Sequence, residues 1–80
     1  MRVEVRLFAT FAAFAPTQQA GIPFEMDVAS AISLGSLISM LGIPETDVHL
    51  AIVNGRPLHD RSHCLKDKDR IGLFPPIGGG

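Results

Sequence analysis

The sequence predicts an α+β fold in which a mixed sheet of about five strands carries one main helix across one face. Apolar and polar residues alternate near both ends of the chain, as they do in strands with one buried face. Residues 34–41 instead place their apolar side chains at helical spacing. The Asn54-Gly55 pair after an apolar run is typical of a tight hairpin turn, because both residues accept positive φ.

The first expected strand covers residues 2–8, where apolar side chains alternate with charged ones. Its buried face consists of Val3, Val5 and Leu7. A short helical turn follows, and Thr10 is placed to cap it. Three residues of this turn are spaced to share one face, namely Phe11, Phe14 and Ala15.

The second expected strand covers residues 22–28, after a loop at 16–21. Its apolar residues alternate with other residues and comprise Ile22, Phe24, Met26 and Val28. Pro23 has no backbone N–H to donate, so the segment suits a strand start or the edge of a sheet.

The expected helix begins after Ser33, whose hydroxyl is a good N-cap acceptor. One apolar stripe follows, made of Leu34, Leu37, Ile38 and Leu41. Gly42 fits the left-handed position that ends many helices, and Pro44 lies just beyond it. Gly35 weakens the helix by about 1 kcal/mol relative to alanine, so packing against the sheet must hold it in place.

Residues 50–53 form the third expected strand, and the turn at Asn54-Gly55 leads to a short return strand at 56–58. The segment 59–69 is polar and irregular, with Leu65 as its apolar anchor.

The last expected strand covers residues 70–74, with Ile71 and Leu73 pointing inward. The resulting order, β-β-α-β-β-β, is that of the β-grasp fold, with the first and last strands side by side in the centre of the sheet. Phe8 and Phe74 then point away from the core at the same ends of neighbouring strands.

Two outward aromatic rings at one place predict a contact surface for a partner, and we expect Leu58 to share it with Phe8 and Phe74. Arg6 and Arg70 flank this surface. Either they pair with acidic residues of the partner, or they are simply solvated.

The ending Leu73-Phe74-Pro75-Pro76-Ile77-Gly78-Gly79-Gly80 resembles that of the MoaD/ThiS family of ubiquitin-like sulfur carriers, and most closely that of the molybdopterin-synthase small subunit. Further matches follow in the expected order along the chain: Arg6-Leu7-Phe8-Ala9, Leu41-Gly42-Ile43-Pro44, Val53-Asn54-Gly55-Arg56-Pro57, Leu65-Lys66-Asp67 and Asp69-Arg70.

The resemblance implies a ubiquitin-like β-grasp protein whose terminal Gly80 is adenylated by an E1-like adenylyltransferase that uses ATP. The acyl-adenylate is then converted to a thiocarboxylate, which donates sulfur in molybdopterin or tungstopterin biosynthesis. A large molybdopterin-synthase-like subunit, or another sulfur acceptor enzyme, is the second implied partner. The chain itself is expected to be a substrate and subunit with no bound cofactor, rather than a free-standing enzyme.

The residue types of the tail suit this chemistry. Glycine has no side chain to obstruct entry into a narrow ATP site, which fits Gly79 and Gly80. Pro75 and Pro76 remove two backbone donors, so the strand ends near Phe74. The six residues beyond Phe74 reach at most about 20 Å.

We therefore expect a single domain over residues 1–80 with a flexible tail at 75–80. The folded body docks outside the partner while the tail inserts, so that Ile77 and Gly78 also contact the partner. Two residues depart from the family pattern. Gly78 replaces a residue that usually has a side chain, and Lys68 stands where a turn glycine is common, which strains the backbone if that position needs positive φ.

The composition argues against several other classes of protein. A net charge of -1 disfavours a nucleic-acid binder, and no apolar run approaches the length of roughly 20 residues needed for a membrane span. The charged, alternating start is unlike a signal peptide. One cysteine excludes both an internal disulfide and the four-cysteine cluster of a ferredoxin, and a free thiol points to the cytoplasm.

His59, His63 and Cys64 invite a metal interpretation, but a closed zinc site needs four ligands and this set offers three. We predict no metal site. Nothing in the sequence indicates a lowered thiol pKa that would make Cys64 a nucleophile.

Three functional alternatives stay open on the sequence. The same glycine tail would serve a protein modifier conjugated through its terminal glycine. It would equally serve a sulfur carrier for thiamine, amino-acid or tRNA thiolation. A structural adaptor with an idle tail is the third.

Overall fold

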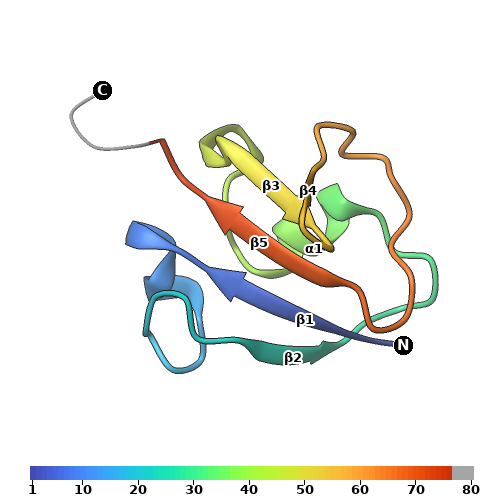
Figure 1. Ribbon diagram of the computed structural model, residues 1–80, viewed down its shortest axis with the longest axis horizontal. Helices are drawn as coiled ribbons and strands as arrows, with labels where there is room; N and C mark the ends of the chain where they lie inside the picture. The colour runs from blue at the N-terminus through green and yellow to red at the C-terminus, as the bar shows by residue number, and fades with distance from the viewer. Residues whose placement is uncertain (77–80) are drawn as a thin grey trace.

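The structure is a computed structural model that describes residues 1–76. Its elements follow one another along the chain as two strands, one helix and three further strands (Figure 1). The strands are β1 (Arg2–Leu7), β2 (Phe24–Asp27), β3 (Leu50–Val53), β4 (Arg56–Pro57) and β5 (Arg70–Phe74). The helices are the α-helix α1 (Leu34–Met40) and the short 3₁₀ helices η1 (Ala9–Phe14) and η2 (Glu45–Asp47).

The five strands form one mixed sheet in the order β2-β1-β5-β3-β4. The first and last strands are parallel neighbours in its middle, with Val5 opposite Ile71 and Leu7 opposite Leu73. The other pairs are antiparallel. This arrangement confirms the α+β, β-grasp prediction and the central placement of the two terminal strands.

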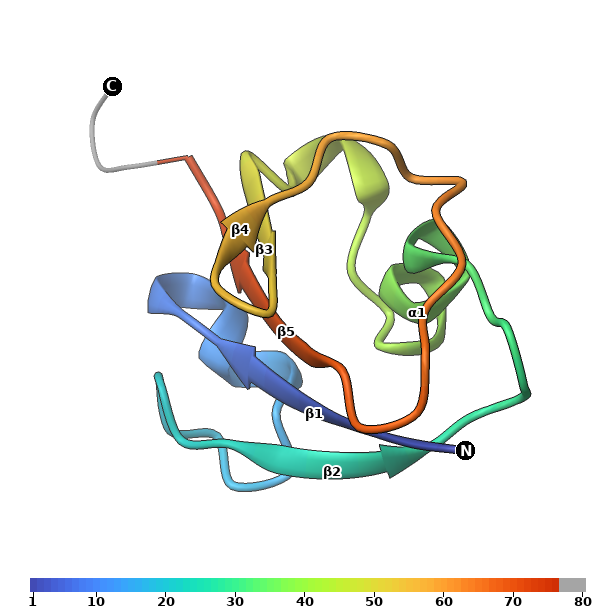
Figure 2. The same cartoon turned by 45° about the vertical axis from the view of Figure 1, so that its right-hand side comes forward.

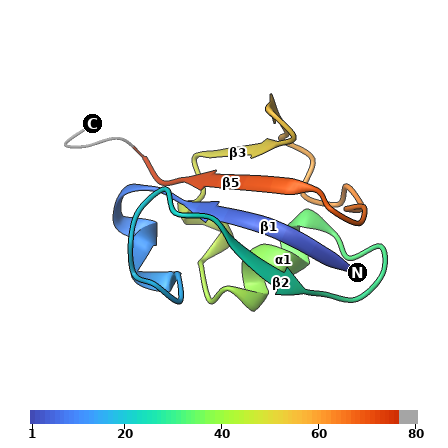
Figure 3. The same cartoon turned by 60° about the horizontal axis from the view of Figure 1, so that its bottom comes forward.

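One face of the sheet is covered and the other is open. Figures 2 and 3 show α1 lying across one side of the sheet, with the 59–69 segment closing the end of that layer. The fully buried side chains come from alternate positions of the central strands and from one stripe of α1. They are Val3, Val5, Leu7, Leu34, Leu37, Ile38, Ile71 and Leu73. The core therefore lies between α1 and the central strands, as the alternation predicted.

The ends of α1 are set by the residues that the sequence indicated. The Ser33 hydroxyl accepts a hydrogen bond from the backbone N–H of Ser36 at 3.1 Å. Gly42 follows the helix with φ +81°, the left-handed conformation that glycine adopts without strain.

The structure also explains why a glycine occurs at position 35, inside the helix. Its N–H donates to the Arg61 carbonyl at 2.8 Å, and a Cβ at this position would lie 3.2 Å from that oxygen. The missing side chain lets the 61–63 backbone approach the first turn of the helix.

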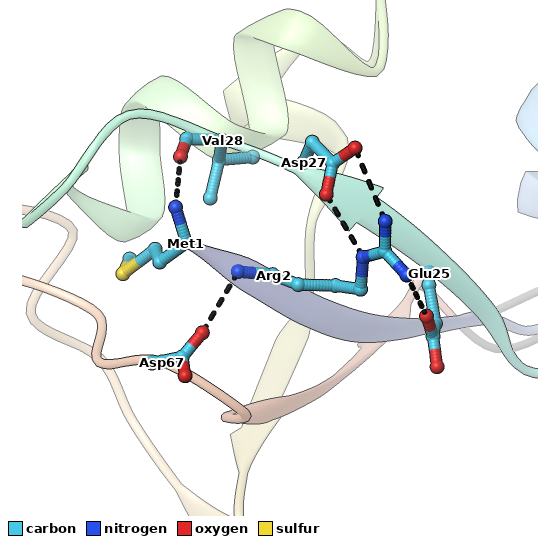
Figure 4. A network of polar contacts seen from close by, with 6 residues as sticks. All are labelled: Met1, Arg2, Glu25, Asp27, Val28 and Asp67. Atoms are coloured by element: carbon cyan, nitrogen blue, oxygen red, sulfur yellow. Dashed lines mark hydrogen bonds and ion pairs between the residues drawn. The ribbon is translucent and has the colours of Figure 1, made fainter.

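The start of β1 is held on both sides by polar contacts (Figure 4). The Arg2 guanidinium donates to Asp27 at 2.8 Å and to Glu25 at 3.1 Å, both on β2. The Arg2 N–H donates to the Asp67 carboxylate at 2.9 Å, and the Met1 amino group donates to the Val28 carbonyl at 2.9 Å. The hydrogen bonds with Arg2 lower the pKa of the Asp27 carboxyl below its ordinary value.

The hairpin turn has the backbone that the sequence indicated, and the turn before β5 has the positive φ that the sequence left open. Asn54 and Gly55 have φ values of +52° and +82°, as a two-residue hairpin between β3 and β4 requires. Lys68 has φ +70°, so a lysine occupies a left-handed position in the turn before β5. The Asp69 carboxylate stabilises this turn by accepting from the Asn54 side chain and from the Lys66 N–H, each at 2.8 Å.

Three local predictions near the N-terminus are wrong. Thr10 does not cap the helical turn, because η1 begins one residue earlier and the preceding Phe8 provides no side-chain cap. Phe14 is 41% exposed and only meets Phe11 edge to face. Ile22 is 44% exposed, because β2 begins at Phe24 and Ile22 lies in the loop before it.

Three strand bounds also differ by one residue. The second strand ends at Asp27, so Val28 follows β2. The first strand ends at Leu7, so Phe8 follows β1 rather than belonging to it. The return strand β4 ends at Pro57, so Leu58 follows it. Over residues 1–76, no helix has both the length and the apolar character needed to cross a lipid bilayer.

Candidate functional site

The open face of the sheet contains a stacked aromatic pair. Leu7 and Leu73 point into the core, so the next residues, Phe8 and Phe74, point to the other face. Their ring centroids are 4.2 Å apart and the planes differ by 4°. Both side chains are half-buried. The structure thus confirms that the two rings lie together at the same ends of neighbouring strands.

A shallow hollow of about 280 Å³ adjoins this pair on β1, β5 and β3. Its lining includes Arg6, Phe8, Ile52, Arg70, Gly72 and Phe74. Ile52 on β3 lies opposite Gly72 on β5, so the apolar surface continues from the aromatic rings onto a third strand.

Gly72 creates the depth of this hollow. A Cβ at this position would lie 3.4 Å from Phe8 Cε2 and 3.6 Å from Phe74 Cε1. Glycine in the interior of a strand often marks a site where another group approaches the backbone closely. Here the approaching groups are the two aromatic rings, and the space beside them stays open.

Charged side chains border the hollow, with Arg70 and Glu4 at the end remote from the rings and Arg6 midway along it. Arg6 lies beside Gly72 across the β1–β5 pair, and Arg70 lies beside Glu4. Arg6 Nε is 3.6 Å from Glu4 Oε2, in a partly exposed ion pair. Arg70 forms no ion pair among residues 1–76. Two arginines therefore face one glutamate here.

The chain leaves the sheet next to the aromatic pair. The Phe74 carbonyl accepts from the His49 N–H at 2.9 Å, which is the last contact of β5 with the β3 side. Pro75 is buried and Pro76 is exposed. The other predicted tail residues, Ile77, Gly78, Gly79 and Gly80, lie outside the described residues.

Leu58 is not part of this surface. Its N–H donates to the Ala51 carbonyl at 2.8 Å, and Ala51 faces the core. Leu58 is half-buried against the same core on the side of the sheet that carries α1. Its role in partner binding stays a prediction, but the structure does not bring it together with Phe8 and Phe74.

The residues considered as metal ligands do not gather either. Cys64 is exposed and forms an isolated β-bridge with Ser33. Within the part of the chain that the structure describes, no three His, Cys, Asp or Glu side chains are close enough to hold a metal ion.

Sequence reasoning missed Ile52 and Gly72. Both had a signal, because Ile52 alternates with Ala51 and Val53, and Gly72 interrupts an otherwise apolar strand. The strand pairing that places them beside Phe74 was needed to assign them to one surface.

Solved structures share this architecture along nearly their whole length. Subunit 1 in the complex of subunits 1 and 2 of molybdopterin-converting factor from Helicobacter pylori is 28% identical, with a TM-score of 0.63 and full coverage of both chains. A putative molybdopterin converting factor subunit 1 from Pyrococcus furiosus is 24% identical, with a TM-score of 0.70 over 96% of this chain and 99% of that one. SAMP1, small archaeal modifier protein 1, from Haloferax volcanii is 21% identical, with a TM-score of 0.71 and full coverage of both chains.

None of the curated proteins matches the chain. A family model does match it, over residues 1–77, and that model describes the Mut7-C ubiquitin family. This match spans all five strands, the helix and the aromatic pair. The chain therefore belongs to the Mut7-C ubiquitin family and is a ubiquitin-like protein of the MoaD/ThiS type.

Proposed function

We propose that the chain is a sulfur carrier whose terminal glycine is adenylated and converted to a thiocarboxylate for molybdopterin or tungstopterin biosynthesis. The observation that carries the proposal is the 28% identity, over both full lengths, to subunit 1 of a molybdopterin-converting factor. The end of β5 supports it, because this central strand ends at Phe74, within the outward aromatic pair.

The proposed chemistry takes place at the carboxyl group of Gly80. A carboxylate oxygen attacks the α-phosphorus of ATP, pyrophosphate leaves, and the product is an acyl-adenylate. A sulfide-level nucleophile then attacks the carbonyl carbon, AMP leaves, and a thiocarboxylate remains. The carboxylate alone is a poor acyl donor, whereas AMP is a good leaving group, so activation must come first.

The fold divides this work between the chain and its partners. The folded body offers a docking face at Phe8 and Phe74, and the tail beyond Pro75 enters the active site of the partner. An E1-like adenylyltransferase supplies ATP binding and the catalytic groups. A large molybdopterin-synthase-like subunit accepts the sulfur, by analogy with the two-subunit complex from Helicobacter pylori.

ATP–pyrophosphate exchange with an E1-like enzyme of the same host tests the proposal. We expect exchange with the chain ending at Gly80, and none when Gly80 is deleted or one residue is added after it. Gly79→Ala should reduce exchange more than it changes the thermal melt. A chain extended at Met1 is the matched control, and it should retain exchange if β1 stays paired.

The intact mass of the protein isolated from its host completes the test. It shows whether Gly80 is the last residue, and one oxygen replaced by sulfur would support the carrier function directly. Exchange that persists in a chain extended past Gly80, without processing back to Gly80, contradicts the proposal.

The second candidate is a protein modifier joined through Gly80 to lysines of other proteins. It is favoured by the fold shared with small archaeal modifier protein 1. The same mass measurement separates the two candidates, because a modifier gives conjugates of higher mass and a carrier gives the thiocarboxylate.

A further inference from the structure

We infer that the hollow beside the aromatic pair binds an extended, acidic segment of a partner protein, with an aliphatic side chain over Gly72 and a carboxylate at Arg6 and Arg70. This inference rests on the proposed function in one respect, because it describes the surface by which a carrier would dock. It concerns side chains of residues 1–76 and needs no chemistry at Gly80.

The hollow has an apolar end and a charged end along the strand direction. Along β5, Gly72 lies two residues after Arg70, and Phe74 lies two residues after Gly72. On β1 the matching positions are Glu4 and Arg6, followed by Phe8. The lining thus changes from charged to aromatic over a length of about 13 Å, since each strand residue rises about 3.3 Å.

The apolar end accepts an aliphatic side chain. The open space is bounded by the edges of two aromatic rings and by Ile52, with the Gly72 backbone as its floor. The hollow as a whole, its charged part included, has a volume of about 280 Å³, which leaves room for more than one side chain of the incoming segment. The depth depends on the missing Cβ of Gly72.

The charged end favours a carboxylate. Two arginines and one glutamate leave a local formal charge of +1, although the chain as a whole has a charge of -1. The Arg6–Glu4 contact of 3.6 Å is exposed and therefore weak. Arg70 has no ion pair among the described residues, so its guanidinium is available for bidentate binding of a carboxylate.

The spacing defines the segment. In an extended chain, side chains at i and i+2 lie on the same face about 6.6 Å apart. This matches the step from Gly72 to Arg70 along β5. A segment with an aliphatic residue and a glutamate at i and i+2 therefore places both groups correctly, whereas i and i+1 places them on opposite faces.

Titration of the ¹⁵N-labelled full chain with capped pentapeptides tests the inference. The probe is Thr-Leu-Thr-Glu-Thr, and the controls replace Glu with Gln, replace Glu with Lys, or move it next to Leu. We expect the probe to shift the amide signals of Arg6, Gly72 and Phe74. The Gln and moved-Glu peptides should bind about threefold more weakly, because a partly exposed charge pair contributes a factor of up to about five.

Variants of the chain supply the second arm. Arg70→Glu should abolish binding of the Glu peptide and increase binding of the Lys peptide. Gly72→Ala should weaken the binding of both peptides, because its methyl group fills part of the hollow. Arg56→Glu is the matched control, because Arg56 is exposed on β4 and does not line the hollow. It should bind the Glu peptide like the unchanged chain, and thermal melts check that every variant is folded.

Equal affinity for the Glu, Gln and Lys peptides, shifts confined to another surface, or no shift at millimolar peptide would each overturn the inference. Stronger binding of a short deoxythymidine oligonucleotide at the same amides would also overturn it, because it would assign the arginines to phosphate. None of these outcomes bears on ATP–pyrophosphate exchange, so failure here is distinct from failure of the carrier function.

Discussion

Lys68 has the backbone conformation of a glycine in the turn that leads into β5. Its φ is +70°, and its N–H donates to the Arg2 carbonyl at 2.7 Å, so the conformation is fixed by the pairing of the turn with the start of β1. A left-handed conformation costs an L-residue about 1–2 kcal/mol. The sequence predicted strain here on the condition that the position needs positive φ, and the structure shows that it does.

Lys68→Gly should therefore stabilise the chain by about 0.5–1 kcal/mol. The free energy gained by relieving the left-handed strain exceeds the entropic cost of ordering a glycine on folding, which is about 0.5–1 kcal/mol. Urea unfolding at constant m-value measures the gain. Lys66→Gly in the same turn is the control and should be destabilising, because Lys66 does not have positive φ. If Lys68→Gly destabilises the chain instead, Lys68 adopts its left-handed conformation without significant strain.

The helix α1 contributes three fully buried side chains to the core, namely Leu34, Leu37 and Ile38. It is only 7 residues long, which is too short to be stable by itself in water. Its stability must come from the sheet and from the 61–63 backbone that meets its first turn.

Leu37→Ala should cost about 2–5 kcal/mol, because it removes a buried side chain and leaves a cavity between helix and sheet. That loss is a large share of the stability of a small domain. The midpoint of urea unfolding measures it. Met40→Ala is the control in the same helix, since Met40 is 54% exposed and its truncation should change the midpoint little. Similar effects of both substitutions would contradict the packing described here.

The contribution of the Arg2–Asp27 contact between β1 and β2 to stability depends on pH. Arg2 lowers the pKa of Asp27, so the contact stabilises the chain above the ordinary Asp pKa and the effect is lost as pH falls through the lowered value. NMR titration of the Arg2→Gln variant should show the Asp27 pKa raised toward its ordinary value. Asp60 is the internal control, because hydrogen bonds from Ser62 lower its pKa and Arg2 has no part in it. An unchanged Asp27 titration would show that the ion pair does not form in solution.

Most elements could be predicted from the sequence, because their signals are local. Alternation located β1 and β5, the apolar run before the Asn54-Gly55 turn located β3, and the Ser33 cap with its apolar stripe located α1. Ile22 was misplaced because alternation continues past the point where pairing stops. The last registered pair of β1 and β2 joins Val5 to Phe24, and beyond it the chain turns through Gly21, whose φ is +75°. The residue at which β2 begins is thus set by where β1 stops pairing with it, and the local sequence pattern carries no information about that.

The candidate site was predictable only in part for the same reason. Phe8 and Phe74 could be placed together because both strands were expected at the centre of the sheet. Leu58 was grouped with them on hydrophobicity alone, but its register opposite Ala51 puts it on the core side. Gly72 is a glycine within a strand, which is a signal by itself, but only the strand pairing that places Phe8 and Phe74 beside it assigns it to this surface.

For the molecule as a whole, the aromatic pair lies where the chain leaves the central strand β5, next to the surface proposed to dock a partner. Phe8→Ala and Phe74→Ala should each leave the domain folded and weaken binding to the E1-like partner by about 2 kcal/mol or more, roughly thirty-fold. Isothermal titration beside a thermal melt measures the two effects separately. Met40→Ala is the control, because Met40 is an exposed apolar side chain on α1, which covers the opposite face of the sheet. Lost stability with unchanged affinity would assign both rings to the core.

The parallel pairing of β1 and β5 also decides how the molecule responds to mechanical force. The N-terminus lies at the start of β1, and the chain leaves β5 at the opposite end of the sheet (Figure 1). Tension between the N-terminus and the tail therefore acts along both strands in opposite directions, and it loads all their mutual hydrogen bonds at once instead of one after another. To separate β5 from β1 under such tension, the hydrogen bonds along the whole β1–β5 pair would have to break together, so the middle of the sheet resists unfolding in this direction.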